Sequence, residues 1–191
     1  MLGLGQIFRS RPEREAARRL YAAVVAQARQ PGFYENCGVP DTPTGRFDLI
    51  ALHGFLVMHR LKGDARGKAV AQALCDAVVE DLDRNLREMG TSDLSVGKKV
   101  KRLMEGFYGR LGAYEEALQS GDEGLISVLR RNLYAAAAPD EAGPAGMARY
   151  VRRETEALAA QPVERLRAGE LRFGAPPSPP DRARAEKETH P

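Results

Sequence analysis

The stretch DAVVEDLDRNLREMGTSDLSVGKK, residues 76–99, joins two amphipathic helical patterns through a glycine break. Before the break, Leu82 and Leu86 continue an apolar stripe with a spacing of four residues, which is typical of one face of an α-helix. Gly90 stands where helices commonly end in a left-handed residue, and the Thr-Ser pair after it can cap a second helix. The stretch therefore predicts a helical hairpin.

The same period of about 3.6 residues continues on both sides of this hairpin, and no run alternates as a half-buried strand would. We therefore expect an all-α fold. Three glycines, Gly106, Gly109 and Gly112, recur within one helix, where each costs about 1 kcal/mol relative to alanine. We expect another helix to cross closely there, or the helix to bend. The six expected helices span about residues 12–30, 42–62, 68–89, 92–119, 123–138 and 144–160.

The composition fits one domain between two terminal segments. A length of 191 residues and a hydrophobic fraction of 43% are sufficient for a single core. Residues 1–11 form a basic N-terminal segment, and residues 12–173 form the helical domain. Residues 174–191 are rich in proline and charge, so we expect a disordered tail.

Several classes of protein are disfavoured by charge, hydropathy and cysteine content. The 29 basic residues are nearly balanced by 26 acidic ones, which indicates a mixed surface and no dedicated nucleic-acid binding. No apolar run approaches the roughly 18 residues of a membrane-spanning helix, and the start lacks the pattern of a signal peptide. The chain has only two cysteines, Cys37 and Cys75, without the further thiols or the CxxC spacing of a disulfide framework or a four-ligand zinc site. We expect no metal or other cofactor.

The carboxylates Asp76, Glu80 and Asp83 share one helical face with Arg87 and leave an alternative open. Together with His53, these carboxylates could bind a cofactor or act as catalytic groups of an enzyme. Because the chain lacks the Glu-x-x-His motifs of carboxylate-bridged metal sites, a salt-bridged or solvated face is favoured. His53 lies within an apolar run, where a core histidine with satisfied hydrogen bonds is the favoured interpretation.

Two basic groups support a second alternative, a peripheral membrane adaptor. One group follows the apolar residues of the N-terminus. The other lies near the start of the helix after Gly90, where cations gain nothing from the helix dipole. The two groups consist of Arg9, Arg11, Arg14, Arg18 and Arg19, and of Lys98, Lys99, Lys101 and Arg102.

Four ordered segments of the chain resemble the ubiquinol-cytochrome c chaperone family. They are AQARQPGFY (residues 26–34), VPDTPTGRFDLIALH (39–53), EDLDRNLREMGTSDLSVGKKV (80–100) and FYGRLGAYEEAL (107–118). The resemblance implies a helical assembly factor of respiratory complex III that has no enzymatic activity. Its expected client is newly made cytochrome b, and a small assembly-factor subunit is a further expected partner. The N-terminus is rich in arginine, but the apolar periodic pattern begins by Leu20 and leaves little room for a mitochondrial presequence, so we expect a bacterial cytoplasmic protein. The resemblance implies that it is peripheral at the inner membrane.

A chaperone of a membrane protein needs an adaptable apolar surface with a polar rim. Candidates for the apolar part are Met58, Met89, Met104, Phe55 and Phe107, most of which we expect in the core. Charged residues within the resembling segments contribute little to core packing, so by analogy they are the expected partner contacts. The predicted partner-binding residues are Arg46, Asp48, Glu80, Asp81, Asp83, Arg87, Glu88, Lys98, Lys99, Arg110 and Tyr114.

Overall fold

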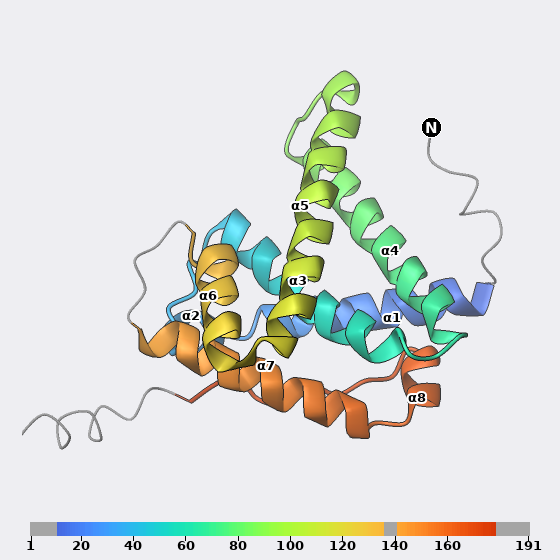
Figure 1. The fold of residues 1–191 in the computed structure, drawn as a ribbon. Coiled ribbons are helices and arrows are strands. Elements are labelled where there is room, and N and C mark those ends of the chain that lie inside the picture. Colours follow the sequence, from blue (N-terminus) through green and yellow to red (C-terminus); the bar gives the residue numbers. More distant parts are fainter. Residues whose placement is uncertain (1–10, 136–140, 179–191) are drawn as a thin grey trace, which may run out of the picture.

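The computed structural model describes residues 11–135 and 141–178, and within these ranges every regular element is an α-helix (Figure 1). The predicted all-α fold class is confirmed. Two helices of about one turn, α2 (Gly32–Glu35) and α8 (Val163–Arg167), are too short to produce a periodic apolar pattern, so the sequence did not reveal them. The long helices are α1 (Arg11–Ala28), α3 (Pro43–Leu61), α4 (Gly67–Glu88), α5 (Asp93–Gln119), α6 (Gly121–Leu133) and α7 (Ala142–Ala160).

Helix α3 is the centre of the domain, because it contacts each of the other long helices and α8. Its sequence is apolar almost all round between Leu49 and Met58, which is typical of a helix that is buried on every side. The helix starts as expected, since the side chain of Thr42 accepts a hydrogen bond from the amide of Gly45 at 3.1 Å and Pro43 occupies the first turn.

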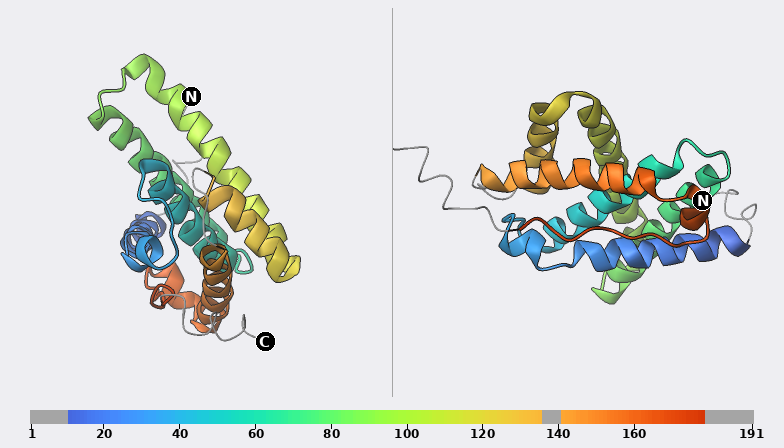
Figure 2. Two further views of the ribbon diagram at one scale, coloured as in Figure 1. Left: turned by 90° about the vertical axis from the view of Figure 1, so that its left-hand side faces the viewer. Right: turned by 90° about the horizontal axis from the view of Figure 1, so that it is seen from below.

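The α4–α5 hairpin projects from the layer that α1, α3 and α7 form (Figure 1). Its turn contains Gly90 with a φ of +78°, which is the left-handed end predicted for α4. At the base of the hairpin, Val78 of α4 and Phe107 of α5 are buried in one cluster with Ala51 of α3. This cluster attaches the hairpin to the domain and leaves its tip free of the other helices (Figure 2).

The expectation of a helix crossing at the three glycines of α5 is wrong. A Cβ atom added at Gly109 or Gly112 would meet no atom within 4 Å, and one added at Gly106 would meet only the side chain of Arg110. These glycines lie on the exposed or half-buried side of α5. The opposite side of the helix carries the buried apolar residues that pack against the domain.

After α8, residues 170–178 form an extended strap that runs back between α1 and α7 (Figure 2). Gly174 connects the strap to both helices. Its amide donates a hydrogen bond to the buried Glu154 carboxylate at 2.8 Å, and its carbonyl accepts one from Gln27 Nε2 at 2.8 Å. Phe173 packs edge-on against the ring of His53 in α3, with ring centroids 5.2 Å apart.

The strap continues beyond Gly174, where the sequence suggested that a disordered tail starts. Asn36 donates a hydrogen bond to the carbonyl of Pro177 at 2.9 Å, so the packed part extends close to residue 178. The strap stays packed because its backbone forms hydrogen bonds with buried polar groups on α1 and α7. The rest of the predicted tail, residues 179–191, and residues 1–10 of the N-terminal segment lie outside the described residues.

Helix α6 ends at Leu133, earlier than the predicted end at residue 138. Tyr134 turns into the core there and donates a hydrogen bond from its hydroxyl to the carbonyl of Cys37 at 2.7 Å. Residues 136–138 of the predicted helix lie outside the described residues. No helix within the described ranges combines the length and the apolarity that crossing a membrane requires.

Candidate functional site

A groove with a volume of about 800 Å³ runs along the hairpin, between α4, α5 and the start of α3. Helix α1 adds one tyrosine to its lining. We call this feature the hairpin groove. It is lined by Tyr21, Pro43, Thr44, Arg46, Phe47, Ile50, Asp81, Leu82, Asn85, Leu86, Glu88, Met89, Lys99, Arg102, Leu103, Gly106 and Arg110.

The floor of the hairpin groove is apolar. Phe47 and Ile50 from α3, Leu82 from α4 and Leu103 from α5 are only partly covered by the rest of the chain. Met89, which follows α4 at the tip of the hairpin, is 72% exposed. A flexible methionine beside a set of aliphatic and aromatic side chains suits an apolar ligand of variable shape.

The two helices that flank the floor contribute opposite charges. The charged residues that α4 places in the lining are Asp81 and Glu88, whereas α5 contributes Lys99, Arg102 and Arg110. Glu88 and Arg102 are exposed, and neither has an ion-pair partner within residues 11–135 and 141–178. The groove therefore combines an apolar floor with one acidic and one basic side, and both sides keep unpaired charge.

Asp81 is held in place by its neighbours on α1 and α4. The hydroxyl of Tyr21 donates a hydrogen bond to Oδ2 of Asp81 at 2.8 Å, and Asn85 donates to the same oxygen at 2.9 Å. Burial, reinforced by this carboxylate, raises the pKa of Tyr21 well above its usual value. The neutral hydroxyl is thus a stable donor, and it fixes the acidic side of the groove against α1.

Beneath the groove, Arg110 of α5 forms an ion pair with Asp48 of α3 at 2.7 Å between Nη2 and Oδ1. Asp48 is buried, with 4% of its side chain exposed. Burial raises the pKa of Asp48 to about 6, and the attraction of Arg110 opposes this rise only in part. The guanidinium carbon of Arg110 also lies 6.0 Å from the ring centroid of Phe47. Arg110 therefore joins a buried carboxylate to the apolar floor.

The structure distributes the predicted partner-binding residues over three places. Arg46, Asp81, Glu88, Lys99 and Arg110 line the hairpin groove. Asp48 and Tyr114 lie below it in the core, and Tyr114 is fully buried, so neither presents a side chain to the surface. The others lie on the hairpin outside the lining: Glu80, Asp83, Arg87 and Lys98.

The face of α4 with Asp83 and Arg87 is salt-bridged, which is the favoured interpretation from the sequence. Arg87 Nε lies 2.6 Å from Asp83, and Arg87 also pairs with Asp93 at the start of α5. In the described part of the chain, no group of three or more histidine, cysteine, aspartate and glutamate side chains is arranged to hold a metal ion. Arg87 therefore links the two arms of the hairpin through Asp93.

His53 lies in the core, away from these carboxylates. It is fully buried between the aromatic rings of Phe33, Tyr150 and Phe173. Its Nδ1 lies 2.8 Å from the carbonyl of Leu49, which can only accept, so Nδ1 carries the proton and Nε2 accepts from the hydroxyl of Tyr150 at 2.8 Å. Burial lowers the pKa of His53 to about 4. The expectation of a satisfied core histidine is confirmed.

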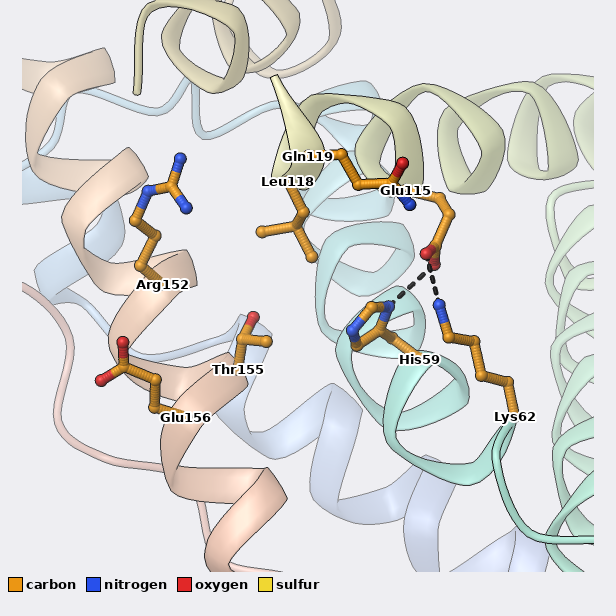
Figure 3. Close-up of a pocket in the computed structure, with 8 residues that line it drawn as sticks. All are labelled: His59, Lys62, Glu115, Leu118, Gln119, Arg152, Thr155 and Glu156. Atoms are coloured by element: carbon orange, nitrogen blue, oxygen red, sulfur yellow. Dashed lines mark hydrogen bonds and ion pairs between the residues drawn. The ribbon is translucent and has the colours of Figure 1, made fainter. Parts of the chain in front are cut away.

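A smaller hollow of about 310 Å³ lies between α3, α5 and α7, and most of the residues that line it carry polar groups (Figure 3). Glu115 accepts hydrogen bonds from Lys62 and from Nδ1 of His59, the latter at 2.8 Å. Burial alone raises the pKa of Glu115, but these two donors outweigh it and hold the pKa below its usual value. Glu115 thus links α5 to the end of α3 on one side of the hollow.

Sequence reasoning did not identify the apolar floor of the hairpin groove. Leu82 and Leu86 belong to a stripe that predicts core, because a residue that faces a groove has the same periodicity as one that faces a neighbouring helix. Of the five candidates for an adaptable surface, only Met89 lines the groove. As expected, most of the others lie in the core: Phe55, Met104 and Phe107 are buried, and Met58 is half-buried.

The chain is similar to known proteins over most of its length. The family model described as ubiquinol-cytochrome C chaperone matches residues 35–173. The ubiquinol-cytochrome c reductase complex assembly factor 1 of Xenopus laevis is 28% identical over 75% of this chain and 72% of its own length. The mouse protein of that name is also 28% identical, and the match covers 83% of this chain and 54% of the mouse protein.

A solved structure has the same fold. The crystal structure of the Cbp3 homolog from Brucella abortus aligns with a TM-score of 0.76 at 36% identity. The alignment covers 88% of this chain and 95% of the Brucella chain. The similarity therefore includes nearly the whole described domain.

Proposed function

This chain belongs to the ubiquinol-cytochrome c chaperone family, and on that premise we propose that its hairpin groove binds newly made cytochrome b during assembly of the ubiquinol-cytochrome c reductase complex. The observation that carries the proposal is the groove itself, because it offers a partly uncovered apolar floor between an acidic and a basic helix. Relatives named as assembly factors of this complex support the same function.

The apolar floor suits a client that is made for the bilayer. A newly made membrane protein exposes apolar helices until they reach lipid, and an amphipathic or apolar helix can be held by a groove that contacts it every three or four residues. Phe47, Leu82 and Leu103 come from three different helices and face the groove together. Their partial exposure leaves apolar surface that such a client would cover.

The charged sides would set the direction in which a client segment lies. Glu88 on one side and Arg102 on the other have no ion-pair partner in the described part of the chain, so a client could pair with each at little cost. Loops that flank membrane helices carry charged residues, and basic residues predominate on the cytoplasmic side. A segment with a basic flank would therefore lie with that flank towards α4.

A binding role without turnover agrees with the chemistry around the groove. Its buried ionisable pair, Asp48 and Arg110, is engaged internally, and the exposed Arg46 is paired with Asp41 at 2.6 Å. The first pair joins α3 to α5, and the second lies at the start of α3. We propose that the protein acts as a holding chaperone, peripheral at the membrane that receives the client.

The proposal is tested by site-specific photocrosslinking in native membranes. A photoreactive amino acid placed at Asn85 or Leu103, inside the groove, should capture cytochrome b, and mass spectrometry identifies the product. A probe at Glu156 on α7, which lies in the smaller hollow, is the matched control. A small assembly-factor subunit would be recovered in the same experiment. Capture of cytochrome b from Glu156 alone, or of no component of the complex from any position, would contradict the proposed site.

Deletion of the gene tests the function independently of the site. We expect less assembled ubiquinol-cytochrome c reductase and less cytochrome b, while other respiratory enzymes persist. A Leu103→Glu variant should fail to restore the complex, because a buried or half-buried charge would occupy the apolar floor. Normal levels of the complex in the deletion strain would refute the function.

A further inference from the structure

The tip of the α4–α5 hairpin exposes large apolar side chains. Among the described residues only three such side chains are exposed, and two of them flank the turn at Gly90: Met89 is 72% exposed and Leu94 is 94% exposed. The tip is also far from the rest of the domain (Figure 1). Two exposed apolar residues at the outermost point of a projecting hairpin indicate a contact surface.

The face of α5 that carries Leu94 is otherwise basic. Lys98 and Lys101 follow Leu94 at intervals of four and three residues, so all three side chains lie on one side of the helix. Val96, two residues after Leu94, points the opposite way and is fully buried. Leu94 and its lysines therefore point away from α4 and from the core.

The α5 side of the tip carries a net positive charge. Residues 87–102 contain five basic residues and two acidic ones. Arg87 is offset by its ion pairs with Asp83 and Asp93, so the positive charge comes from the other four basic residues, which lie on α5. Lys98 and Arg102 have no ion-pair partner within the described ranges, so their charges are available to an external anion.

We infer that the hairpin tip docks on an anionic bilayer, with Leu94 and Met89 entering the interface and Lys98, Lys101 and Arg102 contacting lipid headgroups. A short apolar wedge with a basic surround is the combination that binds such membranes reversibly. A bilayer is the occupant that the observations favour, because the tip combines two exposed apolar side chains with the positive charge of α5. The ion pair of Lys101 with Glu105, at 3.9 Å, is exposed and therefore weak.

Docking at the tip would connect the hairpin groove to the membrane. Met89 belongs both to the exposed tip and to the lining of the groove. With the tip on the bilayer, that end of the groove opens at the lipid surface, so an apolar client segment could leave it without crossing water. This consequence rests on the proposed function, whereas the docking itself does not.

Vesicle binding tests the docking directly. We expect the full chain to sediment with vesicles of phosphatidylcholine and phosphatidylglycerol, and to remain in solution with phosphatidylcholine alone or at high salt. The Lys98→Glu/Lys101→Glu variant should bind at least about tenfold more weakly, since each basic residue near the surface contributes roughly fivefold. Arg66→Glu/Lys68→Glu, which reverses two exposed charges at the opposite end of α4 and roughly 30 Å from the tip, is the matched control. Equal losses for both variants would overturn the inference.

A fluorescent reporter locates the contact, because the chain contains no tryptophan. In the Leu94→Trp variant, anionic vesicles should shift the emission to shorter wavelength, and brominated lipids should quench it. In the Tyr108→Trp variant, roughly 20 Å further along α5, both effects should be absent. If vesicles leave the emission of the Leu94→Trp variant unchanged, the inference is overturned. The chain would then bind vesicles through another segment, or the tip would serve as a contact for a protein partner.

The two proposals fail separately. Leu103→Glu in the groove should lose crosslinking to cytochrome b and keep vesicle binding. Leu94→Glu at the tip should lose vesicle binding and keep the crosslink when client and chaperone are combined in detergent. Loss of both activities in both variants would instead show a folding defect, which circular dichroism detects, and the milder Leu94→Ser and Leu103→Ser variants then decide.

Discussion

Nη2 of Arg110 lies 2.7 Å from Oδ1 of Asp48, directly beneath the hairpin groove. The pair joins α5 to α3 at the place where the floor of the groove meets the core. Asp48 is nearly fully buried, whereas 23% of the Arg110 side chain remains exposed. Arg110, which lines the groove, is therefore held in position by a carboxylate that lies in the core.

Removal of Arg110 should destabilise the domain. Arg110→Ala leaves the buried Asp48 carboxylate without its cation, and the loss of one partner of a buried pair is costly. Because Arg110 is partly exposed, we expect a loss of about 2 kcal/mol in the free energy of unfolding, measured by urea denaturation. Arg46→Ala is the control, since its pair with Asp41 is exposed and should matter little. Equal effects of the two variants would contradict this account.

The raised pKa of Asp48 should produce a pH-dependent term in stability. The unfolded chain ionises Asp48 near pH 4, whereas the folded chain holds the proton until about pH 6. The folded chain therefore binds this proton more tightly than the unfolded chain does. As a result, the free energy of unfolding falls by up to about 3 kcal/mol as the pH rises from about 4 to 6. Asp48→Asn should lack this fall. Urea denaturation of both proteins at several pH values is the measurement, and parallel curves would show that the pKa is unshifted.

His53 should produce a term of the opposite sign. Burial lowers its pKa to about 4, so below about pH 6.5 the unfolded chain binds a proton that the folded chain excludes. This contribution to stability is complete above pH 6.5 and is lost as the pH falls towards 4, by up to about 3 kcal/mol. His53→Gln cannot be protonated and should show a flatter acid limb. An acid limb as steep as that of the unchanged chain would contradict a buried neutral imidazole.

The strap predicts a sharp difference between two truncations. A chain that ends after Phe173 loses the amide and the carbonyl of Gly174, which form hydrogen bonds with Glu154 and Gln27. The loss leaves buried polar atoms without hydrogen-bond partners. We expect it to be destabilised by about 2 kcal/mol or more. A chain that ends after Ser178 keeps these hydrogen bonds and should melt at the unchanged temperature. Calorimetry of the two chains measures the difference, and identical melting temperatures would show that residues 174–178 add no stability.

Local physical chemistry determined much of this fold from the sequence. The apolar stripe of α4, the Thr42 cap of α3 and the left-handed Gly90 each depend on residues within a few positions of one another, so they could be read directly. The three glycines of α5 could not be interpreted in this way, because whether a helix crosses them depends on elements far away in the sequence. The same holds for residues 174–178, whose composition suggests disorder and whose partners lie on α1 and α7.

The candidate site divides along the same line. From the sequence alone, the all-α class, the hairpin and the charged segments that carry the family resemblance could be recognised. The packing of the helices was needed to show that Arg46, Asp81 and Lys99 face one groove, that Asp48 and Tyr114 lie beneath it, and that Leu94 is exposed at the tip. Periodicity shows which side of a helix is apolar, whereas the packing of the other helices decides whether that side is covered, lines a groove or meets the solvent.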